Sequence, residues 1–399
     1  MAAMNRSSQM VPIIVYHSIA DPHAHVLRKL SLPVALFERQ LAYLRKHGFQ
    51  SMDLHDIQHF LRDGRSLPPK ALAITFDDGY LGNWVYAFPL LKRYGMKVTV
   101  FVATDFIDTR ELCRPTLENV WAGRIAQHEL EWWGHLSWTE LQRMQDSGLV
   151  DVQSHTRSHD WQFSSDRVVN FYNPGADYHS LYWLSHPQHK VDWLNADISA
   201  HIPLGRPIYE HRPCLLGEAY HEPSALAAAT TAHVAAHGGP TFFQRPDWRA
   251  QLHEVVAAYR RDGGEAGHRE SSAAYLARVR EEFDGSKTII ETQLGKPVHL
   301  LCWPRGDYSA QLQRIAIEEC GYAATVNVAR VTNRYGDDPH QLRRLGFEQD
   351  YAGPLRRGLV YLNFVGVMNY RSGRASAYPL APITRRLMPA DRALQSLIS

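Results

Sequence analysis

The sequence is poor in cysteine and has no long apolar run. Its four cysteines, Cys113, Cys214, Cys302 and Cys320, show no C-x-x-C spacing and are too sparse for a disulfide scaffold. No stretch of roughly 18 apolar residues occurs, and the opening segment MAAMNRSSQM lacks the apolar run of a secretory signal. These absences favour a reduced, cytoplasmic location for the chain as given, or a periplasmic or extracellular one if a leader has been removed.

A strong charge imbalance is missing as well. The chain has 43 Lys and Arg against 41 Asp and Glu, which argues against a dedicated nucleic-acid binder. Histidine, in contrast, is abundant at 22 residues. Because imidazole titrates near neutral pH and binds metal ions, this favours a metal-binding or proton-transfer role. The 399 residues suffice for one large α/β barrel with an elaboration, or for two to three ordinary domains.

Short apolar runs bounded by turn residues alternate with segments of helical period. The alternation predicts a parallel sheet covered by helices, and a closed or nearly closed barrel is the favoured form. Several expected helices end at a glycine suited to a left-handed C-cap, namely Gly48, Gly95, Gly148, Gly295 or Gly321. The expected strands are 11–16, 71–76, 97–102, 150–153, 298–303, 322–326 and 342–347, and the expected helices are 36–47, 84–94, 139–147, 275–294 and 311–320.

The stretch 161–283 interrupts this alternation and is too long for a loop, so we expect an insertion with its own fold. It contains an alanine-rich helical run at 224–237 and aromatic segments, SLYWLSH at 180–186 and VDWL at 191–194. The aromatic side chains form either a small secondary core or a surface on which sugar rings stack.

The segment ITFDDGY, Ile74 to Tyr80, follows the second expected strand. In parallel α/β folds, reactive groups collect at the C-terminal ends of strands, so Asp77 and Asp78 are well placed for catalysis. Neighbouring side chains at a strand end point in different directions. One carboxylate is thus able to bind a cation while the other faces a substrate, unless the pair is simply an Asp-Gly turn leaving a strand.

The segment SHTRSHD follows the fourth expected strand and contains His155 and His159. If it coils into a helical turn, the two imidazoles lie on one face and bind the same ion. Together with Asp78 they form a set of one carboxylate and two imidazoles that leaves coordination positions open for water and substrate.

A third segment, LLCWPRGDYS, follows the fifth expected strand and ends at Ser309. It reads as a turn around Trp303 and Pro304. A backbone amide of that turn, such as the amide of Arg305, is suited to stabilising a tetrahedral oxyanion.

In this order, the three segments resemble the polysaccharide deacetylases of carbohydrate esterase family 4. The T-F-D-D-G and H-[S/T]-x-x-H motifs of that family match Thr75 to Gly79 and His155 to His159. More loosely, VYHSI at 15–19 looks like the Y-H-x-I opening of one branch, and WPRGDY looks like the third motif of that branch. About two thirds of the chain is covered, and the insertion is not.

The resemblance implies a distorted (β/α)7 barrel, residues 1–160 and 284–358, with the insertion 161–283 between the fourth and fifth strands and an extension at 359–399. It implies a divalent ion, Zn²⁺ or alternatively Co²⁺, Ni²⁺ or Mn²⁺, held by Asp78, His155 and His159. Asp77 would be the general base. Arg305 stands where the family usually has Tyr. This difference leaves the backbone amide in place, but it makes the rim of the expected active site more basic, which suits an anionic substrate.

The family also uses a late histidine as general acid, and the sequence does not single it out. The expected substrate contacts are Tyr80, Trp303, Pro304 and His17, and Arg344 is expected to tether Asp77. The candidates for the general acid are His17, His340, His179, His186, His189 and His211.

The resemblance implies removal of N-acetyl groups from an amino-sugar glycan, such as poly-N-acetylglucosamine, a chitin-like polymer, peptidoglycan or a bacterial surface-glycan precursor. An O-acetyl esterase or a non-sugar amide hydrolase would use the same chemistry, and a non-catalytic glycan-binding protein is the alternative of another class. The run LVYLNFVGVM at 359–368 either packs on the barrel or, with Arg371, Arg374, Arg385 and Arg386, contacts a membrane that carries a lipid-linked glycan. The oligomeric state is open.

Overall fold

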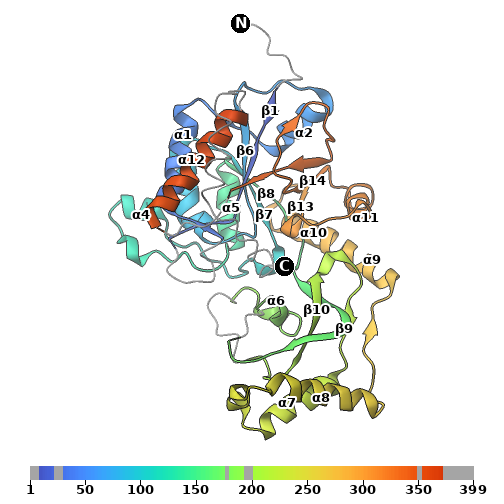
Figure 1. Ribbon diagram of the computed structural model, residues 1–399. Coiled ribbons are helices and arrows are strands. Elements are labelled where there is room, and N and C mark those ends of the chain that lie inside the picture. Colours follow the sequence, from blue (N-terminus) through green and yellow to red (C-terminus); the bar gives the residue numbers. More distant parts are fainter. Residues whose placement is uncertain (1–8, 22–29, 176–178, 193–200, 348–352, 372–399) are drawn as a thin grey trace. The chain divides into compact units, whose positions relative to one another are not determined.

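The computed structural model describes residues 9–21, 30–175, 179–192, 201–347 and 353–371 (Figure 1). The chain divides into two compact units. The first, here called the barrel unit, comprises Met1–Ser158 and Glu282–Ser399, and the second, the insertion unit, comprises His159–Glu281. Most of the segment MAAMNRSSQM lies outside the described residues.

The barrel unit is built on one parallel sheet with the strand order β16-β14-β13-β8-β7-β6-β2-β17. All residues of β6 are buried, as expected for a parallel strand covered on both faces. The strands are β2 (Ile13–Tyr16), β6 (Ala71–Phe76), β7 (Val98–Val102), β8 (Val150–Ser154), β13 (Leu300–Cys302), β14 (Ala324–Asn327), β16 (Gln341–Arg343) and β17 (Leu345–Gly346).

The last expected strand is split at Arg344. Its first half, β16, pairs with β14 at one edge of the sheet, and its second half, β17, pairs with β2 at the other edge. Because a single residue separates the halves, the split strand brings the two edges together. The sheet is therefore a nearly closed, distorted barrel, as predicted.

Helices surround this barrel, and the expected C-caps are confirmed. Gly48, Gly95, Gly148, Gly295 and Gly321 all have φ between 61° and 73°. Three expected helices contain a π-helical turn, at Asn83–Ala87, Glu281–Gly285 and Ile315–Glu319, and α2 was not expected. The helices are α1 (Val34–Lys46), α2 (Leu54–Asp63), α3 (Phe88–Tyr94), α4 (Leu117–Trp121), α5 (Trp138–Asp146), α10 (Ser286–Leu294) and α11 (Ala310–Arg314).

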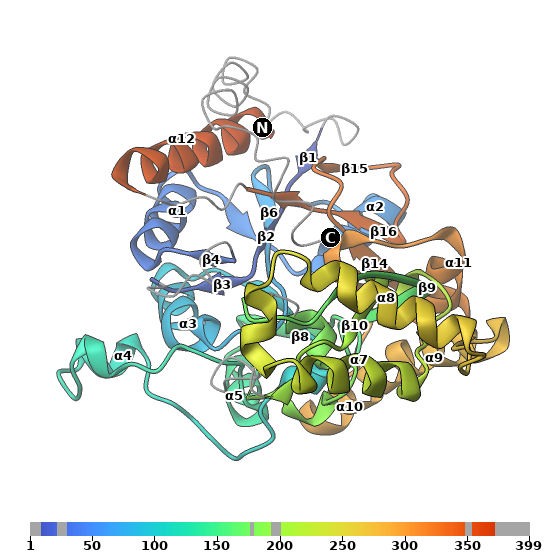
Figure 2. The same cartoon turned by 60° about the horizontal axis from the view of Figure 1, so that its bottom comes forward.

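The C-terminal helix α12 (Gly353–Arg371) lies beside α1 (Figure 2). Val360, Phe364 and Met368 are buried, and the Tyr43 hydroxyl donates a hydrogen bond to the Asn369 side chain. The apolar run 359–368 is thus part of a helix packed on the barrel, and this helix, α12, crosses the boundary expected at 358. Among the described residues, no helix is both long and apolar enough to span a bilayer. Arg374, Arg385 and Arg386 lie outside them.

The insertion unit contains an antiparallel pair of strands, β9 (Trp161–Phe171) and β10 (Pro207–Pro213). The helices α7 (Ser224–Ala236) and α8 (Trp248–Arg261) pack a separate core with Phe171. Leu181, Tyr182 and Trp183 are buried too, which favours a secondary core over a sugar-stacking surface for the segment 180–186. Trp193 lies outside the described residues.

Candidate metal centre and active site

The two adjacent aspartates diverge at the end of β6. Asp78 has φ 69° and Gly79 has φ 77°, so the chain turns sharply through two left-handed residues. The positive φ of Gly79 favours glycine at this position, and a Cβ there would lie 2.8 Å from Ile107 Cδ1. The turn leaves Asp77 buried at 3% exposure and Asp78 partly exposed. The expected divergence is present.

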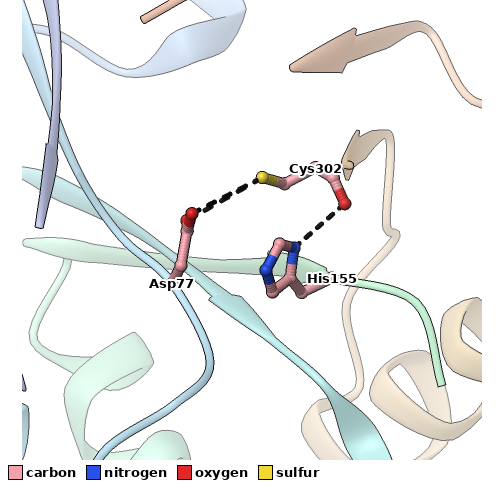
Figure 3. Close-up of side chains that lie close together, drawn as sticks. All are labelled: Asp77, His155 and Cys302. Atoms are coloured by element: carbon pink, nitrogen blue, oxygen red, sulfur yellow. Dashed lines mark hydrogen bonds between the residues drawn. The ribbon is translucent and has the colours of Figure 1, made fainter. Parts of the chain in front are cut away.

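Asp77 is held by the arginine at the split strand. Arg344 donates hydrogen bonds to both carboxylate oxygens, at 2.6 and 2.7 Å, and a third to the Thr75 hydroxyl. Cys302 lies against Asp77, with its Sγ 3.8 Å from the carboxylate oxygens (Figure 3). The same Sγ is 2.9 Å from Arg344 Nη2. Burial raises the pKa of Asp77, but the charge and hydrogen bonds of Arg344 together with the charges of His155 and His17 outweigh this effect, and the pKa is lowered. Asp77 is therefore an ionised carboxylate.

The segment that carries the two histidines does not form the expected helical turn. It leaves β8 as an irregular loop in which Thr156 has φ 66° and His159 has φ 52°. A β-branched residue with positive φ is strained and needs support from its surroundings. Buried Glu282 supplies it, because its Oε2 accepts hydrogen bonds from the backbone amides of Arg157 and Ser158 at 3.1 and 2.8 Å.

A hydrogen bond to the backbone carbonyl of Cys302, on the neighbouring strand β13, fixes the orientation of the His155 ring. Its Nδ1 lies 3.0 Å from the Cys302 carbonyl oxygen, which only accepts, so Nδ1 carries the hydrogen (Figure 3). Its Nε2 points to Asp78 Oδ1 at 3.3 Å. A histidine held in this way by a carbonyl is typical of metal ligands.

Among the described residues, two groups bring potential metal ligands together: Asp78, His155 and His159, and Asp77, His155 and Cys302. Within each group the ligand atoms lie within 4.8 Å of one another. In the second group, Arg344 occupies both oxygens of Asp77 and would repel a cation. The first group offers two imidazoles and a carboxylate, the donor set that suits Zn²⁺. The group of Asp78, His155 and His159 therefore fits a divalent ion. The helical turn predicted to align the two histidines is absent.

The electrostatic field at His155 also suits a cation. Burial alone lowers the pKa of His155, but Cys302, Asp77 and Asp78 together raise it well above its usual value. The pocket around the ring therefore attracts positive charge, which either a proton or a metal ion supplies.

Tyr80 follows the Asp-Asp turn and interacts with Asp78. It is buried, and its hydroxyl forms a hydrogen bond with the Asp78 carboxylate. The buried ring of His135 stacks on it, with 5.1 Å between ring centroids. Burial lowers the pKa of His135 to about 4, so this imidazole is neutral at pH 7. Tyr80 was expected to contact substrate; the structure shows its side chain buried against Asp78. His135, an isolated histidine in the sequence, carries no motif that could have identified it.

The turn after β13 is built around a buried indole. Trp303 is completely buried between Phe283 and Tyr308, with ring centroids 5.6 Å from each, and Pro304 is buried as well. Their position suits packing rather than the expected contact with substrate. Arg305 follows with φ 58°, in a turn closed by a hydrogen bond from the Gly306 amide to the Trp303 carbonyl.

The candidate general acids are widely distributed. His17 follows β2 and contributes to the lowered pKa of Asp77, so it lies at the same end of the barrel. His340 precedes β16 at the opposite strand ends, where its ring contacts the Ala323 carbonyl at 2.9 Å. The other candidates, His179, His186, His189 and His211, belong to the insertion unit, and the His179 side chain is outside the described residues.

Part of this chain is similar in sequence to known proteins. YxkH of Bacillus subtilis (strain 168) is 29% identical over 149 residues, which is 37% of this chain and 43% of that protein. The poly-β-1,6-N-acetyl-D-glucosamine N-deacetylase of Escherichia coli (strain K12) is 28% identical over 144 residues, 36% of this chain and 20% of that protein. The chain thus spans less than half the length of these relatives.

Two solved structures share the fold. A de-N-acetylase from Aggregatibacter actinomycetemcomitans has a TM-score of 0.52 at 17% identity, covering 86% of this chain and 97% of that one. The BpsB deacetylase domain from Bordetella bronchiseptica has a TM-score of 0.50 at 18% identity, covering 86% and 98%. The family model for polysaccharide deacetylases matches residues 64–176, which include the Asp-Asp turn and both histidines. The chain therefore contains a polysaccharide deacetylase domain of carbohydrate esterase family 4.

Proposed function

We propose that this chain is a metal-dependent hydrolase that removes N-acetyl groups from an amino-sugar polysaccharide or glycan. One observation carries the proposal: an ionised, buried Asp77 lies beside a donor set of two imidazoles and a carboxylate at the C-terminal end of the barrel strands. A base next to a metal site is the arrangement that hydrolysis of an amide by water requires.

Asp78, His155 and His159 would hold the ion, with Zn²⁺ as the first choice and Co²⁺, Ni²⁺ or Mn²⁺ as alternatives. A divalent ion there would polarise the acetyl carbonyl and lower the pKa of the attacking water. Asp77 takes a proton from that water as its oxygen attacks the carbonyl carbon. Arg344 keeps Asp77 ionised and oriented for this step.

The remaining steps need an oxyanion donor and an acid. The backbone amide of Arg305, in the turn after β13, is proposed to donate to the oxyanion. His17 is proposed to protonate the sugar nitrogen as the C–N bond breaks, giving acetate and a free amine. Of the two candidates in the barrel unit, His17 lies near Asp77 at this end of the barrel, whereas His340 precedes β16 at the other end.

The experiment is acetate release from N-acetylglucosamine oligomers, with acetylated xylan and small acetamides as competing substrates. The names of the relatives favour poly-β-1,6-N-acetylglucosamine as the first polymer to test. Faster release from acetylated xylan would support the O-acetyl esterase alternative, and faster release from small acetamides would support a non-sugar amide hydrolase. Glycan binding without release of acetate by the metal-loaded protein would support the non-catalytic alternative.

A further inference from the structure

A loop between α4 and α5 is joined to the Asp-Asp turn. The Leu81 amide donates to the Gly134 carbonyl, and the Leu136 amide donates to the Gly79 carbonyl, each at 2.9 Å. These bonds form an antiparallel bridge between Tyr80 and His135. The segment around Gly134 is therefore fixed relative to Asp78, which Tyr80 also contacts.

Two tryptophans precede this bridge. Trp132 and Trp133 are partly exposed, and their rings pack edge to face, with centroids 5.3 Å apart and an interplanar angle of 81°. Gly134 follows with φ 116°, a conformation that disfavours any side chain there. The two indoles thus directly precede a backbone segment that is hydrogen-bonded to the turn carrying Asp78.

We propose that Trp132 and Trp133 form a subsite for a pyranose ring of the glycan, next to the sugar whose acetyl group is removed. This inference rests on the proposed function. Indole rings present a broad apolar face together with a polar N–H, which matches the apolar C–H face and polar rim of a pyranose. The exposed acidic neighbours Glu129 and Glu131 disfavour an anionic membrane as the alternative occupant.

The subsite gives a chain-length preference that the catalytic residues alone do not. A substrate with several sugar rings reaches both the metal site and the indole pair, whereas a small acetyl ester reaches the metal site only. Binding energy from a remote sugar then raises kcat/KM for the oligomer specifically.

The test compares kcat/KM for an N-acetylglucosamine pentamer with kcat/KM for 4-nitrophenyl acetate in the full-length protein. Replacing one indole of the pair, in Trp132→Ala or Trp133→Ala, should lower the ratio of the two values roughly fivefold to tenfold. Trp121→Ala is the matched control, because Trp121 is 43% exposed and the guanidinium of Arg93 covers its ring at 3.6 Å. Its ratio should equal that of the wild type.

An unchanged ratio in both indole variants would overturn the subsite, as would a fall of equal size in Trp121→Ala. Calorimetric titration of the pentamer into metal-stripped protein separates this result from failure of the proposed function. If no substrate releases acetate, loss of pentamer binding in Trp132→Ala and Trp133→Ala still supports the subsite. Pentamer binding that is absent from the wild type, or equal in all proteins, overturns it.

Discussion

Arg344 and Asp77 form a bidentate ion pair inside the barrel, with Nη1 to Oδ1 at 2.6 Å and Nη2 to Oδ2 at 2.7 Å. Arg344 is also the single residue between β16 and β17, where the sheet changes from one edge to the other. Closure of the barrel and orientation of the proposed base therefore depend on the same residue.

Arg344→Met should impair both stability and activity. It leaves the Asp77 carboxylate buried without a counter-charge, which costs about 3–5 kcal/mol of unfolding free energy. The pKa of Asp77, which is lowered in the folded protein, should rise because the opposing effect of burial remains. The acidic limb of the pH profile of kcat/KM should move to higher pH. Arg344→Lys, which keeps the charge, should show a smaller shift, and an unmoved limb in Arg344→Met would contradict the pairing.

Asp77→Asn should separate chemistry from metal binding. The amide keeps the shape of the side chain but accepts no proton, so acetate release should fall about 10²- to 10⁴-fold. Metal content, measured by mass spectrometry, should stay at the wild-type level, because Asp77 is outside the proposed donor set. His155→Ala should lose both metal and turnover. Acetate release by Asp77→Asn at the wild-type rate would remove Asp77 from the role of base.

His135→Gln should change how stability depends on pH. The pKa of His135 is lowered to about 4 from the usual histidine value of about 6.5, so the unfolded chain binds its proton first as the pH falls. The stabilisation is complete above about pH 6.5 and is lost progressively down to about pH 4. Between pH 7 and pH 5, the wild type should lose about 2 kcal/mol more unfolding free energy than His135→Gln. Urea titrations at both pH values measure this, and parallel losses would show that His135 is not buried as a neutral ring.

Glu282→Ala should weaken metal binding although Glu282 is not a proposed ligand. The carboxylate accepts the amides of Arg157 and Ser158 and so supports the strained loop between His155 and His159. Zinc affinity should fall about 10- to 100-fold, the range typical of groups that orient metal ligands. Glu282→Gln retains a carbonyl acceptor and should recover part of the affinity. Wild-type zinc affinity in Glu282→Ala would show that the loop holds its shape unaided.

The sequence predicts those parts of the site that depend on strand ends. Asp77 and Asp78 follow a buried strand, and His155 follows another, so the parallel sheet alone brings them to one end of the barrel. The approach of His159 is not explained by the helical spacing that suggested it. It arises from left-handed Thr156 and from Glu282, more than a hundred residues away, which periodicity does not reveal.

For some residues, burial in the structure changes the role that the sequence suggested. The turn motif predicts that Trp303 contacts substrate, but its ring is completely buried between Phe283 and Tyr308. The aromatic segment at 180–186 shows the same effect in the insertion unit. Conversely, nothing in the sequence links His135 and Trp133 to the candidate site. The link is the bridge between His135 and Tyr80, which are 55 residues apart in the chain.

The central claim is that the second aspartate of the pair and the two histidines hold one cation beside Asp77. A crystal structure of the zinc-loaded protein, with anomalous scattering recorded at the zinc edge, tests it directly. We expect one peak within about 2.0–2.2 Å of an Asp78 carboxylate oxygen, of His155 Nε2 and of a ring nitrogen of His159. A peak among Asp77, His155 and Cys302, or no peak at either group, would contradict it.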